Sequence, residues 1–448
     1  MEIKRNRLFI ASCLALLVTS MTFAIRAKIE GVFGTPMDAG GYGLSKEDVG
    51  WAFGPAFWGF TIAMFAGGLI LDIIGTKKVV WAAFLFHLVG IVILLTARDA
   101  TMLFVSNVFI GLGNGSVEAS LNPMVATLYP KNKTTMLNRF HVWFPGGIVI
   151  GGLLAYFLMD QMDLSWQVLT SLLFIPLALY GYLFYGQNIP ETERVTSGVS
   201  YKDMLRNVGA PFTIIALISA MILIASVPDW NIDFGSNTTY IIMAVIGVLI
   251  VAEGRVMNKI SLLFPFMLIC MFLTAATELG TNQWINALLE DKGVNPIIIL
   301  VVVTGIMAVG RFFAGPLIHS LNPTGVLLGS AIISTIGLYW MSIASGPAIT
   351  LSAAVVFAIG ICYFWPTMLG FVAEYIPESG ALGLSILGGA GMVATSLILP
   401  MMGESIETAG AAATLQTMAI LPAILIAAFL GEIVSEMRGQ VQFTSPGL

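Results

Sequence analysis

The residues most able to do chemistry lie on one face of a single apolar helix, predicted between about residues 101 and 126. At 3.6 residues per turn, one sector of roughly 100° carries its small and polar residues, Asn107, Gly111, Asn114, Gly115, Glu118 and Asn122. A carboxylate inside a membrane span costs roughly 2.5 to 3.5 kcal/mol on insertion scales. Glu118 therefore needs an aqueous cavity, a partner or a proton. The alternative is that these side chains only hydrogen-bond helices together, a role that rarely needs a carboxylate.

A histidine on the next predicted span lies at a similar depth. Counting from the predicted turn at residues 130–133, Glu118 lies roughly 18 Å and His141 roughly 12 Å into the membrane, at about 1.5 Å per residue. The two side chains could meet, directly or through water. A histidine beside a glutamate in a cavity could carry protons, because each group changes the ionisation of the other. Alternatively, His141 caps the turn between the two helices without titrating.

The composition places this helix in a polytopic membrane protein. Of the 448 residues, 57% are hydrophobic and only 10% are charged, and in lipid the backbone must be paired within each segment. We therefore expect an all-α protein embedded in a lipid bilayer. The sparse Lys and Arg residues lie in short predicted loops and give no indication of a nucleic-acid partner.

The sequence carries no signature of an enzyme. Cys13, Cys270 and Cys362 lie in apolar runs without metal-ligand spacing, so we expect neither a metal site nor a disulfide. It contains no metalloprotease histidine pair, Walker loop or nucleophile elbow. We predict no catalytic residues and no cofactor. An embedded transferase or a sensor would need a larger soluble segment than this chain offers.

Apolar runs divide the chain into two blocks of six predicted spans. The first block lies near residues 8–29, 50–71, 79–97, 101–126, 136–159 and 166–186; the second lies near 262–286, 296–318, 325–345, 350–373, 382–402 and 411–432. A polar linker at 187–207 separates the blocks. After it, two apolar runs at 210–227 and 239–252 are interpreted as an inserted transmembrane hairpin. The predicted parts are 1–186, 187–261 and 262–448, with about 14 spans.

The distribution of positive charge predicts the orientation of the chain. With the N-terminus inside, all but five of the 20 Lys and Arg residues lie at cytoplasmic loops or helix ends. Lys4, Arg5 and Arg7 resemble the start of a signal peptide, but the apolar run that follows has no small-residue cleavage site, so it is taken as a retained first span. We expect a multi-pass inner-membrane protein with both termini cytoplasmic. The alternative is 12 spans, with the inserted pair on the surface or partly buried.

The two blocks repeat one another. Landmarks recur roughly 245 residues apart at matching places in each block, as Gly68 and Gly315, Pro123 and Pro366, and Gly147 and Gly391. Duplicated halves are typical of secondary transporters, whose substrate lies near the middle of the membrane between the repeats.

The loop after the second predicted span reads G-L-I-L-D-I-I-G-T-K-K, from Gly68 to Lys78. Gly68 and Gly75 allow close approach and a tight turn, Asp72 lies at a helix end, and Lys77 and Lys78 face the inner leaflet. This spacing resembles the signature loop of the major facilitator superfamily. The resemblance implies two six-helix halves that alternate in access, with this loop as the gating loop. The equivalent segment of the second half has His319 in place of the aspartate.

Within that superfamily, the fourth and fifth predicted spans resemble the fucose:proton symporter family of sugar permeases. The resemblance rests on V-E-A-S-L-N-P, Val117–Pro123, and M-L-N-R-F-H, Met136–His141. It implies that Glu118 is the intramembrane acid and Asn122 its small polar partner. The family commonly has glutamine at the position of His141 and an aspartate in the first span, where this chain offers Arg26, Lys28 and Glu30.

The first span of the second half is polar on one face, with Thr274, Glu278, Thr281 and Asn282. It resembles the broken seventh helix that faces the sugar in facilitator-type transporters. Alternatively, Glu278 is solvated near the outer boundary of the membrane. Four tryptophans on separate spans could offer flat faces to a sugar ring or anchor the membrane interface, Trp58, Trp143, Trp284 and Trp365.

These observations predict proton-coupled uptake of a sugar or related polyol by a monomer. The expected substrate-binding residues are Asn114, Asn122, Asn138, Trp143, Thr274, Asn282, Trp284 and Trp365; the expected proton-coupling residues are Glu118, His141 and Glu278. The runner-up is a proton-driven drug or metabolite exporter with 14 helices, because the fifth span, around Pro145, Gly146 and Gly147, resembles the Pro-Gly motif of drug antiporters.

Overall fold

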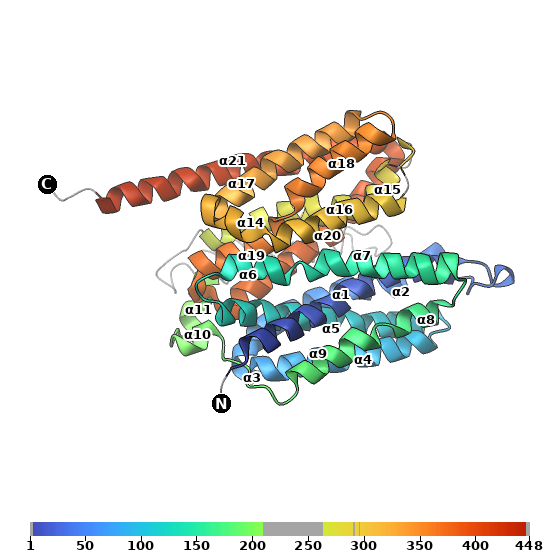
Figure 1. Ribbon diagram of the computed structural model, residues 1–448, viewed down its shortest axis with the longest axis horizontal. Coiled ribbons are helices and arrows are strands. Elements are labelled where there is room, and N and C mark those ends of the chain that lie inside the picture. Colours follow the sequence, from blue (N-terminus) through green and yellow to red (C-terminus); the bar gives the residue numbers. More distant parts are fainter. Residues whose placement is uncertain (1–2, 209–262, 290–291, 295, 445–448) are drawn as a thin grey trace, which may run out of the picture.

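The computed structural model describes residues 3–208, 263–289, 292–294 and 296–444, and its regular structure there is helical (Figure 1). Eleven helices within these ranges are long and apolar enough to cross a membrane, and a shorter apolar helix spans Val301–Phe312. They correspond in order to the twelve predicted spans of the two blocks. The inserted hairpin predicted at 210–252 lies outside the described residues.

The first half of the chain forms one group of helices, the lower group in Figure 1. Its elements are α1 (Arg5–Gly34), η1 (Met37–Ala39), α2 (Lys46–Phe53), α3 (Pro55–Ile74), α4 (Thr76–Thr96), α5 (Ala100–Leu128), α6 (Lys133–Phe140), α7 (Trp143–Ala155), η2 (Tyr156–Gln161), α8 (Trp166–Ser171) and α9 (Phe174–Phe184). Helix α5 lies in the middle and packs on α3 and α4. Most of its residues from Gly113 to Ala126 are buried.

The second half forms the upper group in Figure 1. Its elements are α14 (Leu263–Ala275), η4 (Ala276–Gly280), α15 (Thr281–Leu289), α16 (Pro296–Phe312), α17 (Ala314–Ile343), α18 (Pro347–Ile361), α19 (Phe364–Tyr375), η6 (Pro377–Ser379), α20 (Gly380–Ala409) and α21 (Ala411–Thr444). The halves pack against each other through α3 with α20, α7 with α16, and α6 with α19.

Two short helices of the linker, α10 (Glu193–Thr196) and α11 (Tyr201–Val208), lie at one end of the bundle, on the left of Figure 1. The start of α1 and the end of α21 lie on the same side. We call this the linker end.

Several spans are broken where their sequence weakens a regular helix. Helix α17 contains a kink at Asn322, whose φ is 54°, directly before Pro323. The predicted span 296–318 is likewise two helices, because α16 ends at Phe312 and α17 begins at Ala314. The first span of the second half contains the π-helical turn η4, a kind of irregularity found frequently at functional sites. Of these breaks, η4 carries the buried Glu278.

Candidate functional site

Three side chains form a hydrogen-bonded chain between α5 and the break after α6. Asn122 Nδ2 donates to Glu118 Oε2 at 2.5 Å, and His141 Nε2 lies 3.0 Å from Asn122 Oδ1. Because the amide nitrogen of Asn122 faces the carboxylate, its oxygen must accept, and His141 Nε2 is the donor. His141 Nε2 also lies 3.8 Å from Glu118 Oε2. All three residues are buried.

An arginine of the second half faces this chain. Arg311, in the last turn of α16, is only 1% exposed, and its Nη2 donates to Glu278 Oε1 at 2.7 Å. Its Nη1 donates across the interface to the carbonyl of His141 at 3.3 Å. Its Nε donates to the carbonyl of Cys362 at 2.6 Å. The guanidinium thus connects a carboxylate of its own half with the backbone of the other half.

Both carbonyls that Arg311 contacts lie four residues before a proline. In a helix the carbonyl of residue i accepts from the amide of residue i+4, and Pro145 and Pro366 lack that amide. From the backbone, the carbonyl of His141 accepts a long hydrogen bond, 3.3 Å, from the amide of Phe144. The two prolines therefore leave carbonyl groups available, and one guanidinium bonds to both.

These groups line a cavity between the two halves. Its lining residues are Phe60, Glu118, His141, Phe144, Glu278, Leu279, Arg311, Trp365 and Met392. Three residues predicted from the sequence to carry protons are thus brought together with one predicted to bind substrate, Trp365. Glu278 Oε2 is buried there without a hydrogen-bond partner among the described residues.

Asn114 lies apart from this cavity although it shares a helix with Glu118. Its Nδ2 donates to Thr22 Oγ1 at 3.1 Å, and its Oδ1 lies 2.9 Å from His87 Nε2. The other ring nitrogen of His87 lies 3.2 Å from the hydroxyl of Tyr180. Asn114 therefore joins four helices inside the first half, and it lines a second cavity together with Arg26.

The other predicted binding residues also lie outside the lining of the central cavity. Asn138 is buried nearer the linker end, where its Nδ2 donates to Thr367 Oγ1 of the second half at 3.2 Å. Trp284 Nε1 donates to the carbonyl of Leu399 at 2.9 Å, within the second half. The remaining three are Trp143, at the start of α7, Thr274, bonded to its own helix, and Asn282, which faces a methionine sulfur.

Sequence reasoning missed Arg311, which it had assigned to a helix end on the cytoplasmic side. The available signal was its position inside the apolar run 296–318, since a charged residue within a span is expensive and is usually functional.

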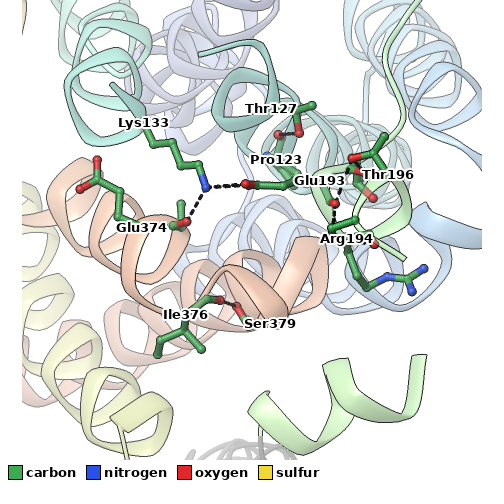
Figure 2. Close-up of polar contacts among 12 residues, drawn as sticks. Pro123, Thr127, Lys133, Glu193, Arg194, Thr196, Glu374, Ile376 and Ser379 are labelled. Atoms are coloured by element: carbon green, nitrogen blue, oxygen red, sulfur yellow. Dashed lines mark hydrogen bonds and ion pairs between the residues drawn. The ribbon is translucent and has the colours of Figure 1, made fainter. Parts of the chain in front are cut away.

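At the linker end, the two halves exchange contacts between helix ends. Lys133, at the start of α6, donates to the carbonyl of Ala373 near the end of α19, at 2.9 Å. In return, Glu374 Oε1 accepts from the amide and hydroxyl of Thr134 at 2.9 and 2.7 Å. Each charge complements the dipole of the helix end it meets. Figure 2 shows Lys133 also reaching Glu193 of the linker, at 2.6 Å.

Arg194, the next linker residue, contacts the end of α3. Arg194 forms an ion pair with Asp72, whose side chain is fully buried, and Thr192 Oγ1 donates to the same carboxylate at 2.5 Å. Nearby, a Cβ on Gly68 would lie 2.5 Å from Ser385 Cβ of α20. Gly75 ends α3 with a φ of 89°, and Lys77 and Lys78 are exposed at the start of α4. Asn207 of the linker donates to Glu378 of the second half at 2.7 Å, so the linker contacts both halves at this end.

The fold is similar to that of several solved membrane transporters. Superposition on the fucose:proton symporter of Escherichia coli gives a TM-score of 0.67 at 13% identity, covering 94% of this chain and 97% of that one. The human organic anion transporter gives 0.69 at 14% identity, with 96% and 100% covered. A proton:xylose symporter gives 0.67 at 16% identity, with 94% of each chain covered.

Sequence comparison identifies the family. A vacuolar membrane amino acid uptake transporter of Schizosaccharomyces pombe is 24% identical over 173 residues, which are 37% of this chain and 29% of that relative. The chain thus spans less than a third of the relative's length. The sequence model of the Major Facilitator Superfamily matches residues 8–398. The chain therefore belongs to the major facilitator superfamily, a family of membrane transporters rather than enzymes.

Proposed function

We propose that this transporter takes up a sugar or a related polyol together with a proton, by alternating access, and that Glu118 binds the proton. The observation that carries this proposal is a buried carboxylate on the cavity between the halves, with the amide of Asn122 as its hydrogen-bond donor. A carboxylate buried in low dielectric is costly unless it is paired with a cation or takes up a proton.

The two carboxylates of the cavity differ in their partners. Glu278 has the guanidinium of Arg311 at 2.7 Å. Glu118 has neutral Asn122, with His141 beyond it donating to Asn122 rather than to the carboxylate. The guanidinium offsets a charge on Glu278, and Glu118 lacks such a partner, so we propose that the proton binds at Glu118. His141 then holds Asn122 in place.

The contacts at the linker end support alternating access. They join the halves through Lys133, Glu374, Asp72 and the linker, so this end is closed. We propose that the linker end is cytoplasmic, as the charge bias predicts, and that these contacts release when the transporter opens inward.

Replacing Asp72 by asparagine should slow transport with little effect on binding. The asparagine keeps the shape of the side chain but leaves the charge of Arg194 without its buried partner, which weakens the closed state. We expect turnover in proteoliposomes to fall about tenfold, a change equivalent to about 1.4 kcal/mol. Equilibrium affinity, measured on detergent-solubilised protein, should change less than about twofold, because Asp72 lies about three turns along α3 from Phe60, which lines the cavity.

The matched control is Asp203→Asn. Asp203 also pairs with a linker arginine, Arg206, but both side chains are partly exposed, at 47% and 34%, and exposed pairs contribute little. Wild-type turnover is expected for this variant. A large loss of affinity with normal turnover in Asp72→Asn would show that the loop acts on substrate binding rather than on closure of the linker end.

The placement of the whole chain is part of the proposal. We propose a monomer in the inner membrane with both termini cytoplasmic. Its two halves, 1–186 and 262–448, would be separated by a cytoplasmic linker and a transmembrane hairpin within 187–261, giving about 14 spans. The charge bias and the position of α10 and α11 at the end shared by α1 and α21 support this arrangement.

Uptake by reconstituted vesicles tests the proposed function. A panel of labelled monosaccharides, both neutral and acidic, and of polyols is offered with and without an imposed inward proton gradient. We expect at least one member to accumulate above its outside concentration only when the gradient is present. Vesicles without protein are the control for leakage.

Other outcomes separate the alternatives. Equilibration without accumulation would make the protein a facilitator without proton coupling. Gradient-driven transport of these or other metabolites in the outward direction would favour an exporter. An exporter is the second candidate because the fifth span resembles that of drug antiporters.

A further inference from the structure

Arg26 is a partly buried cation on α1, within the membrane-spanning part of the first half, and its Nε is buried with no hydrogen-bond acceptor among the described residues. No ion pair joins it to another residue in the part of the chain that the structure describes. Glu30 lies one turn further along the same helix. Intramembrane arginines are expensive and are usually retained for function.

The surroundings of Arg26 suit an anion. Its guanidinium lies 4.7 Å from the ring centre of Phe57 and 5.9 Å from that of Phe23. The two rings hold the guanidinium by cation–π contact without consuming its donors. The cavity it lines contains the amide side chains of Asn107 and Asn114 and no carboxylate among its lining residues. Both amides are neutral, so the lining of the cavity provides no negative charge; the carboxylate that acts on Arg26 is that of Glu30, outside the lining.

Arg26 lies close to the wall of the central cavity. Phe23, three residues earlier, packs against Phe60 and Phe144 at ring-centre distances of 6.4 and 6.0 Å, and both of these line the cavity. At about 1.5 Å per residue, Arg26 lies roughly 4.5 Å further from the linker end. That is the side from which a substrate would reach the cavity while the linker end is closed.

We infer that the substrate carries a carboxylate, which Arg26 binds, so that it is a sugar acid rather than a neutral sugar; this inference rests on the proposed proton-coupled uptake. The geometry supports it. A buried donor of Arg26 has no acceptor among the described residues, and no carboxylate lines the cavity beside it. Glu30 acts electrostatically on Arg26 but forms no ion pair with it. The proton on Glu118 and a monoanionic substrate carry opposite charges, so the two cross together without net charge.

Matched pairs of substrates test the inference on the wild-type protein. Glucose is compared with glucuronate and galactose with galacturonate, since each acid differs from its sugar only at the terminal carbon. Under an inward proton gradient we expect the acid of at least one pair to accumulate, and its neutral partner to compete at least tenfold more weakly. A potassium diffusion potential of either sign should change the uptake rate of the acid less than about twofold.

Variants locate the anion site. Arg26→Gln should raise the half-saturation concentration for the acid by about tenfold to a hundredfold, the range for a lost hydrogen bond to a charged group. Arg26→Lys, which keeps the charge, should raise the half-saturation concentration for the acid less than tenfold. The control is Lys28→Gln on the same helix, because Lys28 forms a partly exposed pair with Asp160 at 2.5 Å; it should behave as wild type.

Each result has one interpretation. Proton-driven uptake of the neutral sugars with no response to the acids overturns the inference and leaves the proposed function intact. Uptake of the acids with unchanged half-saturation in Arg26→Gln also overturns it, because the anion is then bound elsewhere. If neither sugars nor acids move with protons, the proposed function fails, and the inference fails with it.

Discussion

Vesicles that contain Glu118→Gln are expected to exchange substrate across the membrane but to lose accumulation driven by a proton gradient. Glutamine keeps the shape of the side chain and can still bond to Asn122, which donates to Glu118 at 2.5 Å in the wild type. It cannot bind and release a proton. Exchange needs only the loaded carrier to reorient, whereas accumulation needs the empty carrier to return in a proton-dependent way. The measurement is counterflow of labelled substrate beside gradient-driven uptake in the same preparation.

The comparison distinguishes three roles for Glu118. Loss of exchange as well as accumulation would make Glu118 a substrate ligand or a structural residue. Retained accumulation would show that the proton binds elsewhere, at His141, Glu30 or Glu278. The matched variant is His141→Gln, which restores the residue common in the fucose:proton symporter family. It should retain accumulation if the histidine only holds Asn122.

Arg311→Met is expected to abolish transport and to destabilise the protein by about 3–5 kcal/mol, the cost of removing one partner of a buried ion pair. The methionine fills similar space but leaves Glu278 charged and buried at 2% exposure. It also removes the donor to the carbonyls of His141 and Cys362. Thermal unfolding of the detergent-solubilised protein and uptake by vesicles measure the two effects separately.

Two controls accompany this variant. Arg98→Met changes the same charge at an exposed position and should leave both measurements at wild-type values. The double variant Arg311→Met with Glu278→Met replaces the whole pair by apolar groups and should recover most of the stability without recovering transport. A single Arg311→Met variant as stable as wild type would contradict the buried pair.

The sequence predicted the helices of the two halves well, and the central site only in part. Hydrophobic runs locate spans because lipid excludes unpaired backbone, so the helices described follow the predicted order. The polar face of α5 was also predicted, but its sector of roughly 100° is wide enough to face two neighbours. Glu118 faces the second half, whereas Asn114 turns into the first half toward His87.

The partners across the interface could not be predicted. Asp72 was expected to clasp the halves, yet nothing in its own loop indicates that Arg194, more than a hundred residues later, is its partner. Arg311 was assigned to a helix end on the cytoplasmic side because basic residues near helix ends usually face the cytoplasm. Periodicity specifies which face of a helix is polar, but the pairing of faces between distant helices depends on how the helices pack.

The two carbonyl groups released by Pro145 and Pro366 have a consequence for hydration. While the linker end is closed, Arg311 donates a hydrogen bond to the carbonyl of His141 across the interface at 3.3 Å. If the halves separate, that bond breaks, and Pro145 provides no amide to replace it, so water must take the place of the guanidinium. That carbonyl belongs to the residue whose ring lies 3.8 Å from Glu118. Separation of the halves would therefore draw water to the proton site itself, so that wetting of Glu118 and opening of the carrier become a single event.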